Sequence, residues 1–240
     1  MPRAKPNRPP VPKEAIEYFA AKGIKPGFNY TDVWREEHNA AFTAAKLMEL
    51  DILQAVRDIT ERAIVEGTTF EKFKKDVGPL LDRSGWSNYH KETPKVSRIR
   101  LIYDTNMRVA RAAGQWQRIE RTKDALPYLE FGPTSSLHPR ETHEVYVGLV
   151  LPVDDPFWDG CMPPLDYRCK HTVTQLTASE VDRAGGPSDA PDYPEVEWRL
   201  PNGVVETAPY GVHPAFNYNP GKERTKGLDD ALARAEERTK

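Results

Sequence analysis

Proline limits what this chain can fold into, because 22 of its 240 residues are proline, about twice the usual share of roughly 5%. Five of the prolines fall in residues 1–12 and seven fall in residues 185–225. Segments of this kind are expected to be extended, rich in turns, or unfolded in isolation. The folded core is therefore expected between the two proline-rich ends.

The two ends are predicted to differ. Residues 1–12 also hold three cations and no acid, which indicates a flexible basic arm or simply a disordered terminus. Residues 185–225 are expected to form an extended arm that wraps a surface, with one hairpin at Asn202-Gly203. Residues 226–240 predict a short, charged helix. We expect neither a signal peptide nor a membrane span, because no apolar run approaches the roughly 20 residues that a span needs.

Apolar residues recur at helical spacing through residues 13–123 and predict an antiparallel helical half. The expected helices cover residues 12–23, 31–67, 68–85 and 94–123. Thr68 or Thr69 is the predicted N-cap of the third helix, because a threonine side chain accepts a hydrogen bond from the free N–H groups of the first turn.

The helix expected over residues 94–123 is strongly basic, with eight cationic and two acidic side chains. Four arginines fall close to one helical face: Arg108, Arg111, Arg118 and Arg121. Either this face contacts nucleic acid or an acidic partner, or it is a solvated face that pairs with acids elsewhere in the chain. The net charge of −2 excludes a globally basic nucleic-acid binder but not a local basic face.

The pattern changes after residue 123, where short strands and turns replace long helices. Alternating residues predict strands over 128–134 and 145–152, and a small helix is expected after Thr177 or Ser179. Residues 124–184 are therefore expected to form a compact unit, called the module below. Together with the helical half, the module gives an α+β fold class.

The sequence has no phosphate-binding loop, dinucleotide fingerprint or GxSxG motif. The histidines and cysteines of the module are therefore the candidates for a metal site or a catalytic site. His143, Cys169 and His171 offer the imidazole and thiolate ligands that zinc prefers, with Cys161 as a further candidate. Cys169 and His171 alternate on an expected strand, so both side chains can point the same way. The sequence has no CxxC knuckle, so we expect no cofactor, with zinc as the alternative.

The same residues also fit structural roles. Each cysteine can be a small buried apolar residue, and the two are not expected to form a disulfide. Arg140 and His143 belong either to a buried polar network or to a catalytic pair. A metal-dependent hydrolase or nuclease would use His143 and His171 with an aspartate such as Asp154. We do not expect this protein to be an enzyme, because acid–base catalysis needs two titratable groups within reach of each other and the spacing alone does not place such a pair.

The module carries a series of residues in a distinctive order: Arg140, His143, Asp154, Asp155, Pro156, Phe157, Trp158, Pro163, Pro164, Cys169 and Val173. This series resembles the phage Mu protein F-like family of minor head and head-morphogenesis proteins. Flanking segments resemble the same family, so the resemblance covers most of residues 12–222. This chain departs from the family's pattern at three positions: His138 stands where the family has an arginine, Ser136 where it has an acid, and His171 where it has a cysteine. Cys169 and His171 still offer two soft-metal ligands.

The resemblance implies a minor head protein of a Mu-like bacteriophage or prophage that acts in head morphogenesis or DNA packaging. It implies binding to the portal, the major capsid protein or a scaffold protein, with DNA contact through the basic helix as a further expectation. Such a protein is made in the host cytoplasm and ends in the virion. Proline-rich arms suit a protein that finishes folding on a partner.

Overall fold

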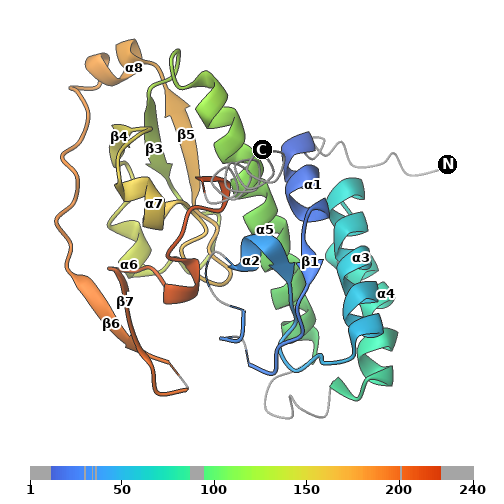
Figure 1. Cartoon of the computed structure of the whole chain (residues 1–240). Coiled ribbons are helices and arrows are strands. Elements are labelled where there is room, and N and C mark those ends of the chain that lie inside the picture. Colours follow the sequence, from blue (N-terminus) through green and yellow to red (C-terminus); the bar gives the residue numbers. More distant parts are fainter. Residues whose placement is uncertain are drawn as a thin grey trace, which may run out of the picture.

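A computed structural model of the chain describes residues 12–29, 31–33, 35, 37–86, 95–200 and 202–222. The α+β class is confirmed, and Figure 1 shows the helical half on one side and small sheets with short helices on the other. The basic arm expected over residues 1–12, apart from Pro12, and the helix expected over residues 226–240 lie outside the described residues. Of the helices that are described, none is both long and apolar enough to cross a bilayer.

The helical half is built from helices whose ends follow the sequence signals: α1 (Lys13–Ala20), α3 (Leu50–Glu66), α4 (Phe70–Arg83) and α5 (Lys95–Thr122). α3 ends at Gly67, which takes the left-handed conformation at φ 61°. α4 begins at Thr69, whose side chain accepts a hydrogen bond from the backbone N–H of Lys72. The predictions of helices over 68–85 and 94–123 are confirmed, and Thr69 is the cap.

The prediction of a single helix over residues 31–67 is wrong. The chain forms a short α2 (Glu37–Ala40) and then β2 (Ala41–Phe42), which pairs in parallel with β1 (Gly23–Ile24), before α3 starts. Lys46 takes a left-handed φ of 69°, and its N–H donates to the carbonyl of Gly27 at 2.8 Å. This long-range backbone pairing competes with the helix, while Phe42 still reaches the core. Trp34, which falls within residues 31–67, lies outside the described residues.

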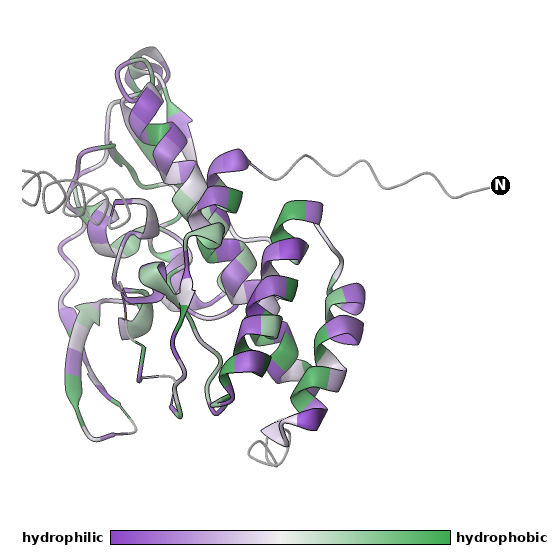
Figure 2. Ribbon diagram, turned by 45° about the vertical axis from the view of Figure 1, so that its right-hand side comes forward, coloured by the Kyte–Doolittle hydropathy of each residue, from purple (hydrophilic) through white to green (hydrophobic). Residues whose placement is uncertain are grey.

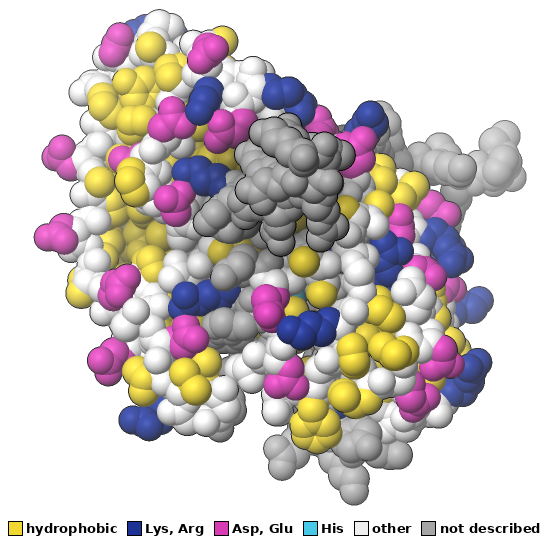
Figure 3. Space-filling view, viewed as in Figure 1, with side chains coloured by type: hydrophobic (Ala, Val, Ile, Leu, Met, Phe, Trp, Pro, Cys, Tyr) yellow, Lys and Arg dark blue, Asp and Glu magenta, His cyan; other side chains and the backbone are white. Residues whose placement is uncertain are grey.

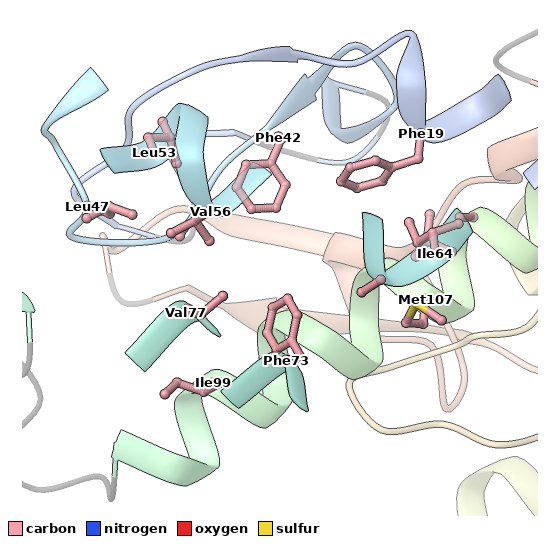
Figure 4. Close-up of a cluster of buried hydrophobic side chains, with 14 of the residues drawn as sticks. Phe19, Phe42, Leu47, Leu53, Val56, Ile64, Phe73, Val77, Ile99 and Met107 are labelled. Carbon is pink, nitrogen blue, oxygen red and sulfur yellow. The ribbon is translucent and has the colours of Figure 1, made fainter. Parts of the chain in front are cut away.

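The first core lies where α1, α3, α4 and α5 meet (Figure 4). The ribbons of the helical half alternate between hydrophilic and hydrophobic turns (Figure 2), as expected for helices that bury one face. Phe19 and Phe42 meet edge to face with ring centroids 6.0 Å apart, which brings α1 and β2 together. Because Phe42 arrives from a strand, this core depends on both helical and non-helical backbone.

α5 contributes to two cores and joins the halves of the molecule. Its first part places Ile99 and Met107 in the first core, and its last turns place Trp116 and Ile119 in the core of the module. The boundary expected after residue 123 therefore follows a helix that both units share.

The module is a three-stranded antiparallel sheet with β3 (Tyr128–Gly132) between β4 (Val150–Pro152) and β5 (Thr172–Leu176). Short helices flank it: α6 (Glu141–Glu144), α7 (Phe157–Cys161) and α8 (Ala178–Arg183). Thr177 caps α8 in a capping box with Glu180, as the sequence predicted for this small helix. The strand expected over 145–152 is shorter than predicted, because residues 145–148 form a turn in which Gly148 has a φ of 85°.

The C-terminal segment forms the predicted hairpin from β6 (Glu195–Arg199) and β7 (Val205–Pro209), followed by a single 3-10 turn, η2 (Pro214–Phe216). Residues 187–194 form neither helix nor strand, in keeping with the expected arm. The segment is nevertheless packed against its own chain. Val212 lies in the core of the module and Phe216 lies in the first core, so this segment completes both cores instead of waiting for a partner.

Gly211 brings this segment against α6 in a way that only glycine permits. Its φ is 75°, and a Cβ at this position would lie 2.4 Å from the carbonyl oxygen of Thr142. We expect Gly211→Ala to lower the free energy of unfolding by about 2–3 kcal/mol, measured by urea denaturation. Gly203→Ala is the control, because Gly203 has a similar φ of 84° but no neighbour within 4 Å of the added carbon, so it should cost about 1 kcal/mol. Equal losses for the two variants would contradict the close approach to α6.

Candidate functional site

Three side chains of the module meet at one buried point. His143 lies in α6, and Cys169 and His171 lie just before β5. One ligand atom from each of them lies within 4.8 Å of the other two. The exposed fractions of His143, Cys169 and His171 are 1%, 3% and 8%. Among the residues that the structure describes, this is the group of histidine, cysteine and carboxylate side chains close enough to share a metal ion.

The local backbone turns these side chains inward. Arg168 takes a left-handed φ of 64°, and the N–H of Cys169 donates to the carbonyl of Asp166 at 3.0 Å, which closes a tight turn. Arg140 joins this turn to α6, because its guanidinium donates to the carbonyl of Tyr167 at 2.9 Å and pairs with Asp166 at 3.3 Å. The turn and α6 are therefore held side by side.

His171 has a partner on each ring nitrogen. Its Nδ1 lies 3.5 Å from the Cys169 sulfur, and its Nε2 lies 3.0 Å from Oε1 of Glu144. Its ring also lies 5.5 Å from the His143 ring and 5.3 Å from the Phe131 ring, measured between centroids. The imidazole is therefore fixed in orientation as well as in position.

The charge states of this pair follow from those contacts. Burial raises the pKa of the Cys169 thiol, but hydrogen bonds with His143, with His171 and with the backbone outweigh burial and lower the pKa to about 6. Burial lowers the pKa of His171, but its hydrogen bonds with Cys169 and Glu144 outweigh burial and raise the pKa above its usual value. At neutral pH Cys169 is therefore mainly a thiolate, the form that binds metals and attacks electrophiles.

Two kinds of chemistry suit a thiolate between two imidazoles. One is metal binding, for which thiolate and imidazole are the preferred ligands of zinc. The other is nucleophilic attack by Cys169 with His171 as base and Glu144 as the group that orients it. The hollow beside the three side chains measures about 20 Å³, room for one water molecule but not for an organic substrate. The arrangement therefore favours an ion over a substrate.

The region that holds this cluster also matches a family of known proteins. Residues 54–174, just over half of the chain, match the family model described as phage Mu protein F like protein. This chain belongs to that family.

The Mu F-like relatives are longer than this chain. The putative capsid assembly protein F of Escherichia phage Mu is 29% identical over 253 aligned residues, which cover 93% of this chain and 57% of that protein. The Mu-like prophage FluMu F protein of Haemophilus influenzae is 29% identical over 170 residues, covering 65% of this chain and 41% of that protein. The chain thus spans about half the length of these relatives. No solved structure matches the chain.

Most residues that carry the Mu F-like resemblance have structural partners. Asp155 accepts a hydrogen bond from the N–H of Phe157 at 2.8 Å, where α7 begins. Trp158 is fully buried, and its indole N–H donates to the carbonyl of Pro152 at 2.9 Å. The peptide bond between Pro163 and Pro164 is cis.

Other candidates from the sequence lie outside the cluster. Cys161 is a free, buried thiol in α7, and burial raises its pKa to about 12. It is not among the three grouped side chains. Asp154 is exposed and pairs with Lys123 at 2.8 Å, so the hydrolase interpretation lacks its aspartate. Arg140 and His143 have separate partners and do not form an acid–base pair with each other.

The basic face of α5 is partly neutralised. Arg118 and Arg121 both pair with Glu14 of α1, which ties the two helices together. Arg111 is exposed, and Arg108 is partly buried with its Nε lacking a hydrogen-bond partner. Arg118 and Arg121 therefore pair with an acid elsewhere in the chain, which was one of the two interpretations of this face. DNA contact through this helix stays a prediction.

Two features of this region were not predicted from the sequence. Glu144, the partner of His171, follows His143 directly, and this adjacency is the only signal that marked it. A cavity of about 420 Å³ lies between the helical half and the module, lined by His38, Phe42, Trp86, Arg98, Tyr167 and His213. Nothing in the sequence pattern indicated it, because its walls come from segments far apart in the chain.

Proposed function

We propose that this chain is a minor head protein of a Mu-like bacteriophage or prophage, and that it acts in head morphogenesis by binding the portal or the procapsid shell. The observation that carries the proposal is the alignment of 93% of the chain with a protein named putative capsid assembly protein F. The family model, which matches residues 54–174, includes the His143–Cys169–His171 cluster. A location in the virion and a part in DNA packaging are further elements of the same proposal.

The surface suits contact with other proteins. Figure 3 shows cationic and acidic side chains interspersed over one face of the molecule, with hydrophobic side chains gathered on the side of the module. Several large apolar side chains of the module, the following arm and the hairpin are exposed: Val145, Val147, Tyr193, Val204 and Val205. Apolar side chains at a surface support association with protein partners.

The test is a phage or prophage that lacks this chain and is complemented by a tagged copy. We expect the uncomplemented lysate to lose most infectious particles, because heads are missing, misassembled or empty in electron micrographs. The tagged chain should co-purify with the portal, the major capsid protein or the scaffold protein from lysates of the complemented phage.

The control is deletion of a phage gene of unrelated function, which shows any general effect of a deletion on the phage. Normal titre and normal, filled heads without this chain would contradict the proposal. Recovery of the tagged chain free of every head protein would contradict the binding part of it.

A further inference from the structure

We propose that His143, Cys169 and His171 bind one Zn²⁺ ion, which joins α6 to the start of β5. The proposal goes beyond a role in head assembly, because it concerns how the module itself is held together. It rests on the positions of the three side chains, on their burial, and on the partner of His171.

The spacing of the ligand atoms fits zinc. Zinc–sulfur bonds near 2.3 Å and zinc–nitrogen bonds near 2.0–2.1 Å, at tetrahedral angles, place sulfur and nitrogen about 3.5 Å apart. The Cys169 sulfur and Nδ1 of His171 lie 3.5 Å apart. A ring nitrogen of His143 lies within 4.8 Å of both. The site therefore needs only a small inward shift of His143 to close around an ion.

Glu144 prepares His171 for this role. When Nε2 donates its hydrogen to Oε1 of Glu144, at 3.0 Å, the lone pair of the neutral ring is left on Nδ1. Nδ1 is the nitrogen that faces Cys169. A carboxylate behind a ligating histidine is the common arrangement in zinc proteins, where it fixes the tautomer and the ring plane.

A small hollow beside the cluster offers room for a fourth ligand. Its volume of about 20 Å³ accepts one water molecule, and Thr134, Ser136 and His138 stand on its rim. Three protein ligands and one water complete a tetrahedron. One thiolate and two imidazoles favour zinc over magnesium or calcium, which prefer oxygen ligands.

The ion would crosslink α6 to the segment before β5, which the Arg140 contacts and the hydrogen bond between His171 and Glu144 already bring together. α6 has four residues, and the turn at residues 166–168 is linked to it by Arg140. The chain has two cysteines, and both are free thiols, so no disulfide stabilises the module. A metal bound only by the folded state stabilises that state by mass action.

The first experiment measures metal in the full chain. The protein is purified without an affinity metal column, dialysed against Zn²⁺ and then against metal-free buffer, and analysed by elemental mass spectrometry. We expect one zinc per chain for the parent protein and for Cys161→Ser, and less than one tenth of that for Cys169→Ser. Cys161 is the matched control, since it is the other buried cysteine of the same core. Equal zinc in the two cysteine variants, or none in the parent, would overturn the proposal.

Cobalt reports the geometry directly. Addition of Co²⁺ to the metal-free chain should produce the intense visible bands of tetrahedral coordination and a thiolate charge-transfer band in the near ultraviolet. Both should persist in Cys161→Ser and disappear in Cys169→Ser. Weak octahedral bands without charge transfer would contradict the ligand set.

Three further measurements test the proposal even if a cysteine variant fails to fold. The melting temperature of the parent chain should rise with Zn²⁺ concentration and fall when a chelator is added. Glu144→Gln, whose side chain lies outside the ligand set, should bind zinc 10–100-fold more weakly while still folding. Alkylation of Cys169 at the same rate with and without zinc would indicate a reactive thiol instead of a metal ligand and would overturn the proposal.

Discussion

Trp158→Ala is expected to lower the free energy of unfolding by about 4 kcal/mol, which would leave the module close to unfolded. Trp158 is fully buried, and its ring lies 5.0 Å from the Phe157 ring. Its indole N–H donates to the carbonyl of Pro152, and its own carbonyl accepts a hydrogen bond from the Asn219 side chain at 2.9 Å. The residue therefore joins the end of β4, α7 and the C-terminal segment. Truncation leaves a cavity and removes the indole hydrogen bond to Pro152.

The measurement is urea denaturation followed by circular dichroism, with Trp198→Ala as the matched control. Trp198 is half-buried on β6 and packs at the edge of the same core, so its loss should cost only about 1–2 kcal/mol. Similar losses for the two tryptophans would show that Trp158 is not the centre of the module.

Features that depend on neighbouring residues were predictable from the sequence. Thr69 and Thr177 cap helices because a hydroxyl stands next to free N–H groups of the same turn. The hairpin turns at Asn202-Gly203 because glycine tolerates the φ of 84° found there. Each of these choices is made within a few residues, so the sequence contains all the information it requires.

Features that depend on distant segments were harder to predict. Phe42 falls on the apolar stripe of the helix expected over residues 31–67 and is indeed buried, yet it reaches the core from a strand. Helical periodicity records which side chains are buried, not how the backbone carries them there. The parallel pairing of β2 with β1, residues 41–42 with residues 23–24, decided the backbone.

The candidate site shows the same division. Cys169 and His171 were placed together from their spacing of two residues, although both lie just before β5 and not on the strand as expected. His143 lies 26 residues before Cys169, and only the fold of α6 against the turn at 166–168 brings it near. Glu144 was missed because its role depends on which face of the four-residue α6 meets β5.

Acid is expected to destabilise the helical half through His38. Burial, together with the positive charge of Lys22, lowers the pKa of this imidazole from 6.5 to about 4, against the opposing effects of Glu37 and a hydrogen bond at Val33. In the unfolded chain His38 is therefore protonated near pH 6.5, whereas in the folded chain it is protonated only near pH 4. The contribution of His38 to stability is full above about pH 6.5 and is lost as the pH falls. The total loss by pH 4 is about 3 kcal/mol.

The control is His38→Gln, which keeps a hydrogen-bond donor for Val33 but has no group that titrates in this range. Urea midpoints of the parent chain and of the variant should be compared at pH 7 and at pH 4. Carboxylates elsewhere contribute equally to both proteins, so the difference between their losses isolates His38. His38 lines the 420 Å³ cavity, whose lining residues include the cation Arg98 but no acidic side chain to pair with a protonated imidazole. If both proteins lose the same stability, the imidazole is not shielded from water in the folded chain, and the cavity must be open to solvent at that wall.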